Sequence, residues 1–235
     1  VDALLGSEFS EELDAWDFGS LERLGGDRYH VDCNWKLAMD TFGETYHFNS
    51  LHKNSLAMFF EGNVQCYDTF GQHHRMILCR KAIHAMRELP EDQWDITVAG
   101  LPVYWLFPNT ILLPNDSGMY VVRAYPDSAS PGRHTSVITF YTRPSGHRDG
   151  SSDEIGAERE AQIQSAPVEA LKEVAQRFAE IIRDEDYVAS ASQQRSAASG
   201  ALPHVVFGRN EPALHHYHNT YRAALGEAPL PLLEA

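Results

Sequence analysis

The stretch PVYWLFPNTILLPNDSGMYVVRAY, residues 102–125, decides the fold class. It contains three runs rich in aromatic and aliphatic residues, at 102–107, 110–113 and 119–125. Short turns separate these runs, and the second turn is the sequence Asn-Asp-Ser-Gly at 115–118. Consecutive strands joined by turns this short, with no helix between them, pair antiparallel. The stretch therefore predicts an antiparallel meander.

Further strands are expected on both sides of this meander. Residues 135–143 predict the next strand, and residues 64–80 predict a hairpin whose runs VQCY and RMILCR flank the turn FGQHH. Apolar and polar residues alternate over 27–32, which is the period of a short strand. We expect this strand to follow a loop that ends on the glycine pair at 25–26.

Helical patterns surround the predicted strands. Residues 8–26 predict a short acidic helix and a loop, and Asn34 is a plausible N-cap for a helix from Trp35 to about Tyr46 or His47. A loop at 145–153, a long helix over 154–198 with a break near 165–167, and a last helix over 212–225 complete the expected elements. The sequence holds no internal repeat and no low-complexity linker. We therefore predict one α+β domain over residues 1–235.

Composition excludes several classes of function. The chain has 235 residues with 33 acidic and 19 basic side chains, a net charge of −14, and this acidic excess argues against nucleic acid or an anionic membrane as a partner. No run approaches the roughly 18 apolar residues of a membrane helix. Three scattered cysteines and the lack of a visible signal peptide predict a cytoplasmic protein. The first residue is Val1, not Met, and a segment that precedes it is expected.

The densest group of metal-capable side chains lies in NWKLAMDTFGETYHFNSLHKNSL, residues 34–56. Glu44 and His47 are three residues apart, so on a helix they share a face, and the carboxylate can accept from the imidazole N–H that does not bind metal. His47 and His52 lie about 140° apart on an unbroken α-helix and could not share an ion there. A common site therefore requires that the helix end or bulge near residues 49–50.

Other metal sites fit the sequence less well. There is no His-Glu-x-x-His motif for a zinc peptidase. A di-iron carboxylate bundle needs a second Glu-x-x-His, which this chain lacks. We interpret His215, His216 and His218 as the polar face of the last helix.

The block Asn34-Trp35-Lys36, Phe42-x-Glu44-x-Tyr46-His47 and then His52 resembles the iron-binding signature of the α-subunits of Rieske-type ring-hydroxylating oxygenases. The resemblance continues through FPNT at 107–110, the Glu185-Asp186 pair followed by Gln193, and the tail GRNEPALHHYHNTYRAAL, and covers most of residues 28–225. The His-x4-His block is its most specific part. The resemblance implies a helix-grip (START-like) fold, in which an antiparallel sheet wraps around long helices.

The resemblance also implies a mononuclear Fe(II) held by two histidines and one carboxylate. It assigns His47, His52 and Asp186 as the metal ligands. Helical periodicity places both Glu185 and Asp186 on or beside the apolar face and Asp184 away from it, so the choice of Asp186 rests on the resemblance. Glu44 matches the acidic residue that links an iron ligand to the Rieske cluster of a neighbouring subunit, where it serves electron transfer.

None of the three cysteines forms the Cys-x-His or Cys-x2-His pairs of a Rieske [2Fe–2S] domain. We therefore expect that domain upstream and interpret this chain as the catalytic domain. The alternative is a stand-alone protein in which the iron site is vestigial or served by a separate electron donor. The implied partners are O2, a small apolar substrate, a ferredoxin or reductase, further copies in a homotrimer and, in some family members, a β-subunit. Six side chains were candidates to line the substrate pocket, namely Phe48, Leu51, Met58, Phe59, Tyr104 and Trp105.

The predicted reaction is O2-dependent hydroxylation or cis-dihydroxylation of an aromatic or other apolar substrate, as in aromatic hydrocarbon catabolism. One alternative is a monooxygenase of the same family acting on a quaternary amine, which needs a pocket lined by three or more Tyr or Trp side chains. The other is a metal-free protein of the same architecture that binds an apolar ligand.

Overall fold

The computed structural model describes residues 2–115, 117–143 and 167–233. Its centre is one antiparallel sheet of seven strands in the order β1-β7-β6-β5-β4-β3-β2. The strands are β1 (Glu22–Val31), β2 (Phe60–Phe70), β3 (His73–Arg80), β4 (Gly100–Leu106), β5 (Thr110–Asn115), β6 (Gly118–Pro126) and β7 (His134–Thr142). The predicted meander and hairpin are confirmed, and the last strand returns to pair with the first.

Boundaries of the first three strands differ from the prediction, and β2 begins at Phe60 instead of Val64. Strand β1 begins at Glu22, so Gly25 and Gly26 lie within it and pair with Phe140 and Thr139 of β7. A Cβ on Gly26 would lie 2.5 Å from the Ile138 carbonyl oxygen, so glycine permits this close pairing instead of breaking the strand. In the hairpin, residues 73–74 of the expected turn belong to β3.

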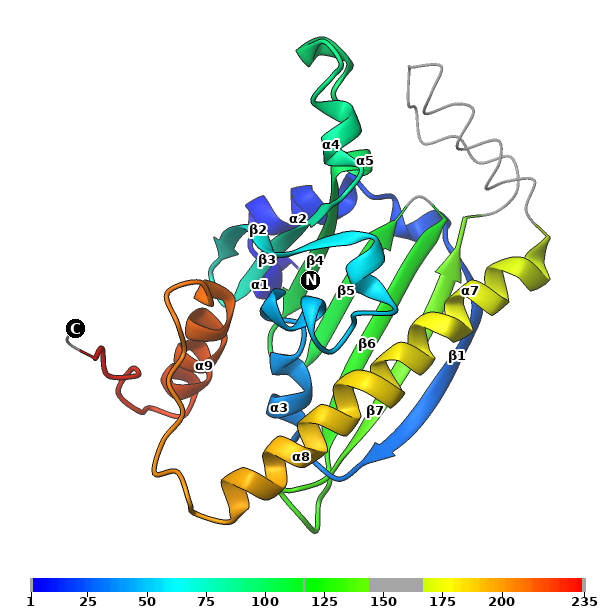
Figure 1. The fold of residues 1–235 in the computed structure, drawn as a ribbon. Coiled ribbons are helices and arrows are strands. Elements are labelled where there is room, and N and C mark those ends of the chain that lie inside the picture. The colour runs from blue at the N-terminus through cyan, green and yellow to red at the C-terminus, as the bar shows by residue number, and fades with distance from the viewer. Residues whose placement is uncertain (1, 116, 144–166, 234–235) are drawn as a thin grey trace.

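The helices divide between the two faces of the sheet (Figure 1). Helices α1 (Asp2–Leu5) and α2 (Ser7–Asp14) cover one face around the buried side chain of Phe9. The opposite face carries the larger core and packs against α3 (Trp35–Asp40), α7 (Val168–Ile181), α8 (Tyr187–Ala198) and α9 (Pro212–Ala224). The shorter elements are η1 (Phe18–Ser20), η2 (Tyr46–Asn49), η3 (Leu56–Met58), α4 (Ile83–Met86), η4 (Glu91–Gln93) and α5 (Ile96–Ala99).

Helices α7 and α8 form one continuous rod that crosses the sheet diagonally (Figure 1). A single π-helical turn, η5 (Ile182–Asp186), joins them. Residues 154–166 of the predicted long helix and the loop at 145–153 lie outside the described residues. The rod against an antiparallel sheet is the expected α+β helix-grip arrangement, and that prediction is confirmed.

Helix α3 is shorter than predicted. Asn34 caps it as expected, since its side chain accepts a hydrogen bond from the Lys36 backbone N–H at 2.9 Å. The helix ends at Asp40, whereas the sequence pattern suggested residue 46 or 47. The chain that follows therefore leaves α-helical geometry and turns before it reaches His47.

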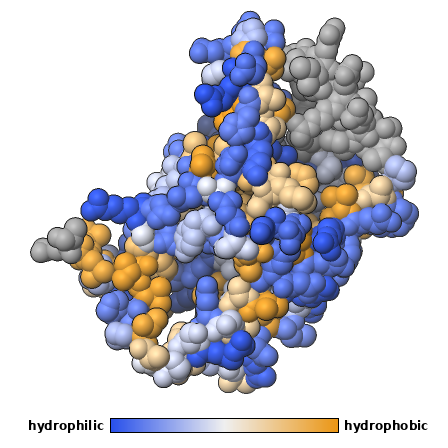
Figure 2. All heavy atoms as spheres, viewed as in Figure 1, coloured by the Kyte–Doolittle hydropathy of each residue, from blue (hydrophilic) through white to orange (hydrophobic). Residues whose placement is uncertain are grey.

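The face of the molecule shown in Figure 2 is largely hydrophilic. In the view of Figure 2, hydrophobic residues form separate patches among polar ones. No helix in the described ranges is long and apolar enough to span a bilayer.

The three histidines of α9 differ from their predicted role as a polar face towards solvent. None of the three is exposed. The ring of His216 contacts His74 of β3 at 5.3 Å between centroids, and His218 pairs with Asp40 at 2.8 Å. The prediction was wrong because His216 packs against the sheet, His218 against α3 and His215 against Phe207.

Buried His74 makes the stability of this core depend on pH. Burial, with nearby His216 and His73, holds the pKa of His74 well below its usual 6.5. Below pH 6.5, His74 therefore binds a proton in the unfolded chain but not in the native state. As a result, the free energy of unfolding falls as the pH falls. Between pH 6.5 and 5, we expect the free energy of unfolding of His74→Gln to fall less steeply than that of the wild type. The difference between the two slopes should reach up to about 1.4 kcal/mol per pH unit.

Urea denaturation at several pH values measures this slope. The control is His84→Gln, because the His84 side chain is 61% exposed. Equal slopes for wild type and His74→Gln would show that His74 does not contribute to acid destabilisation.

Candidate metal centre

His47 and His52 come together because the chain leaves helical geometry before it reaches them. Helix α3 ends at Asp40, and His47 lies on the separate 3-10 turn η2, with His52 in the turn that follows. Their rings lie 4.9 Å apart between centroids. The bend that a shared site required is present, although it begins earlier than residues 49–50.

Asp186 completes the cluster from the π-turn on the opposite side. Its Oδ1 atom lies 3.6 Å from Nε2 of His47 and 3.3 Å from Nε2 of His52. One ligand atom from each of the three side chains lies within 4.8 Å of the others. His52 and Asp186 are 1% and 5% exposed, so a bound ion would be shielded from bulk water.

The electrostatics of this cluster favour a positive charge. Burial alone would lower the pKa of His47, but the nearby carboxylates of Asp186 and Glu44 outweigh burial and raise it to about 9. Burial would likewise lower the pKa of His52, and Asp186 and Glu185 raise it. Burial would raise the pKa of Asp186, whereas the two imidazoles lower it. The same geometry stabilises a proton or a metal cation.

Glu44 holds the imidazole of His47 in place. Its carboxylate pairs with Nδ1 of His47 and also accepts the His47 backbone N–H at 3.2 Å. An ionised carboxylate only accepts hydrogen bonds, so Nδ1 of His47 carries the proton and Nε2 faces Asp186. Glu44 is 8% exposed. The sequence predicted this contact from helical spacing, but a 3-10 turn provides it.

The acidic residues beside Asp186 point elsewhere. Asp184 is exposed and forms an ion pair with Arg183 at 2.6 Å, in agreement with its predicted position away from the apolar face. The Oε2 atom of Glu185 lies 2.7 Å from Nδ1 of His52. Glu185 therefore contacts the edge of the imidazole remote from Asp186 and is not part of the ligand cluster.

An apolar cavity of about 50 Å³ adjoins the three candidate ligands. Besides Glu44, His47, His52 and Asp186, Thr41 is its one polar lining residue among those the structure describes. The remaining wall is hydrocarbon, from Phe42, Phe48, Leu56, Phe60, Leu78, Leu101, Val103, Leu113, Phe178 and Ile182. No Tyr, Trp, Lys or Arg in the described ranges lines it.

Only Phe48 of the six expected pocket residues lines this cavity. Met58 and Phe59 are about 60% exposed. Tyr104 points to the other face of the sheet, where it packs in the cluster of Phe9, and Trp105 contacts Tyr217 of α9. Adjacent residues of a strand face opposite sides, which the prediction for Tyr104 and Trp105 neglected.

The donor set fits a mononuclear iron. Nε2 of His47 is buried and has no hydrogen-bond partner among the described residues, which is costly unless a ligand engages it. Two imidazole nitrogens and one carboxylate oxygen match the facial donor set of non-haem Fe(II) oxygenases. His47, His52 and Asp186 would hold the ion.

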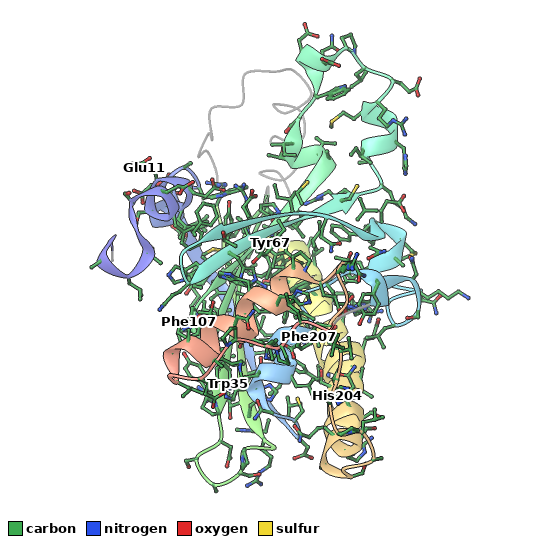
Figure 3. All side chains as sticks on the ribbon, turned by 90° about the vertical axis from the view of Figure 1, so that its left-hand side faces the viewer. Glu11, Trp35, Tyr67, Phe107, His204 and Phe207 are labelled. Atoms are coloured by element: carbon green, nitrogen blue, oxygen red, sulfur yellow. The ribbon has the colours of Figure 1, made fainter. Side chains whose placement is uncertain are left out.

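Two more blocks of the sequence signature meet at α9. Tyr221 donates a hydrogen bond to the Pro108 carbonyl at 3.0 Å, and its ring contacts Phe107 and Trp35. Figure 3 shows Trp35 and Phe107 beside this helix, on the same side of the molecule. The FPNT run and the C-terminal tail are therefore in contact with the start of α3.

Comparison with solved structures shows the fold. A quaternary ammonium Rieske monooxygenase, CntA, studied for carnitine oxidation and inter-subunit electron transfer, is 14% identical with a TM-score of 0.62, over 96% of this chain and 55% of its own. Pseudomonas putida CBB5 NdmA, a mutant solved with caffeine, is 14% identical with a TM-score of 0.52, over 88% of this chain and 53% of its own. The chain thus spans about half the length of these structures. No curated protein matches the sequence significantly.

The family comparison covers nearly all of the chain. Residues 18–227 match the model of the ring hydroxylating alpha subunit (catalytic domain), a span that contains the sheet, the candidate ligands and α9. The protein therefore belongs to the ring-hydroxylating oxygenase α-subunit family, and residues 18–227 match the family's catalytic domain.

Proposed function

We propose that this domain binds one Fe(II) through His47, His52 and Asp186 and hydroxylates or cis-dihydroxylates an apolar substrate with O2. The convergence of these three side chains at an apolar cavity carries the proposal. Bound iron would supply the activation of O2. The protein would hold the ion, shield it from bulk water and place the substrate beside it.

The composition of the cavity favours an uncharged aromatic or aliphatic group as the substrate. Four phenylalanines and six aliphatic side chains form its wall, and no Lys or Arg among the described lining residues could pair with a substrate carboxylate. The three or more Tyr or Trp side chains that the quaternary-amine alternative requires are likewise not found among the described lining residues. The metal-free alternative leaves the buried Nε2 atom of His47 without a hydrogen bond, 3.6 Å from the Asp186 carboxylate.

The cavity also limits substrate size in this conformation. An engineered protein cavity of about 150 Å³ holds benzene, roughly three times the volume here. Side chains of the wall must therefore move for an aromatic ring to bind. Phe178 is half-buried on α7 and its ring packs at a tilt against Tyr120, 4.4 Å between centroids, which makes it a candidate for that movement.

We propose that electrons reach the site through Glu44 from a Rieske [2Fe–2S] domain of a neighbouring subunit. Glu44 contacts Nδ1 of His47, and Tyr46 beside that histidine is 50% exposed, so this corner of the domain is near the surface. The proposal includes an upstream Rieske domain, a ferredoxin or reductase donor and a homotrimer, which a β-subunit can accompany. We place the protein in the cytoplasm, and aromatic hydrocarbon catabolism is the process proposed for it.

The test supplies the full-length protein and a reductase with ¹⁸O2 and a panel of neutral aromatics, aromatic acids and quaternary amines. We expect ¹⁸O in hydroxylated products of the neutral aromatics, and none from Asp186→Ala. Turnover confined to the quaternary amines would support the alternative. Iron-free protein that binds neutral aromatics without turnover would favour the binding-protein class.

A further inference from the structure

We infer that Glu185 is a positioning residue for the metal centre, which sets the tautomer and orientation of His52. This inference rests on the proposed iron site. Sequence periodicity left Glu185 as a rival metal ligand, and the geometry gives it a different role.

The first step is the contact itself. Oε2 of Glu185 lies 2.7 Å from Nδ1 of His52, within the range of a charge-assisted hydrogen bond. A carboxylate only accepts, so the proton must lie on Nδ1. In the neutral imidazole, Nε2 then carries the lone pair, and this is the atom that lies 3.3 Å from Asp186.

The second step is that Glu185 is itself held in place. The Ser55 hydroxyl lies 2.8 Å from the same Oε2 atom and donates to it. Ser55 is three residues from His52, and its backbone N–H donates to the His52 carbonyl at 2.9 Å. The imidazole, the carboxylate and the hydroxyl thus form a closed group between the His52 turn and the π-turn.

The π-turn of the backbone allows Glu185 and Asp186 to contact different atoms of the site. Consecutive residues of an α-helix point about 100° apart. The π-turn at Ile182–Asp186 inserts one extra residue into the helix. As a result, Asp186 lies next to Nε2 of both His47 and His52, and Glu185 contacts Nδ1 of His52. Glu44 makes the equivalent contact with Nδ1 of His47, so each imidazole has its own carboxylate partner.

The test measures Fe(II) affinity by competition with a chelator in four variants. Loss of the partner of a metal-binding histidine typically weakens metal affinity about 10- to 100-fold. We expect this for Glu185→Ala, and a smaller loss for Glu185→Gln, which keeps an acceptor oxygen, and for Ser55→Ala. Asp184→Asn is the matched control in the same turn, because Asp184 is exposed and pairs only with Arg183 among the contacts of its carboxylate.

A second readout follows His52 without iron. In ¹⁵N-labelled metal-free and Zn(II)-loaded protein, NMR should show a His52 Nδ1–H protected from exchange in wild type and Asp184→Asn, and lost in Glu185→Ala. Unchanged affinity and unchanged Nδ1–H protection in Glu185→Ala would overturn the inference. A third outcome separates the two claims. If the wild type bound no iron, but Glu185→Ala still lost the protection of His52 Nδ1–H, the proposed function would be contradicted and the role of Glu185 supported.

Discussion

Replacing His52 with alanine should abolish stoichiometric iron binding. The variant removes a 1% exposed imidazole whose Nε2 lies 3.3 Å from Asp186, and with it one of three donors. Loss of a ligand exceeds the effect of losing a supporting contact, so we expect affinity for Fe(II) to fall by at least about 100-fold. Metal analysis of protein reconstituted under anaerobic conditions measures the content per chain.

The matched control for this prediction is His84→Ala, since His84 is exposed and pairs with Glu61 on the surface. Far-UV circular dichroism should show the same secondary structure in both variants. A His52→Ala protein that keeps one tightly bound iron per chain would contradict the assigned site.

Deleting Asp184 should also remove iron binding while the long helix remains. The deletion takes out the extra residue of the π-turn, so the rod can continue with α-helical hydrogen bonds through this segment. Glu185 and Asp186 could then no longer both keep their present contacts with His52. We expect a loss of Fe(II) affinity of at least about 100-fold, comparable to the loss of a ligand.

The control changes the same residue without changing the length of the chain. Asp184→Ala removes an exposed carboxylate but keeps the π-turn, and should bind iron as wild type does. Chelator competition and circular dichroism compare the two proteins. Equal iron affinity in the deletion and the substitution would show that the π-turn is not needed for the site.

The sheet was predictable because its pattern is local. Aromatic and aliphatic runs broken by two short turns at 102–125 specify neighbouring antiparallel strands, and the structure has them. The start of β1 was missed because Gly25 and Gly26 normally indicate a loop. Here they permit close pairing with β7, a requirement that depends on a strand more than 100 residues away.

The candidate site was predictable in its ligands and not in its geometry. The spacing of Glu44, His47 and His52 stands out locally, whereas selecting Asp186 needed the family resemblance. Nothing in the sequence from 182 to 186 indicates a π-turn, and the role of Glu185 depends on that turn. Phe42, Phe60 and Phe178 of the cavity wall come from three separate parts of the chain, and only tertiary packing brings them together.

The most direct test of the account is a crystal structure of the iron-loaded protein with anomalous scattering measured at the iron edge. The account predicts one iron peak per chain, bound by Nε2 of His47, Nε2 of His52 and the carboxylate of Asp186, with Glu44 and Glu185 on the two Nδ1 atoms. A peak elsewhere, an iron bound by Glu185 in place of Asp186, or no peak after reconstitution would contradict it.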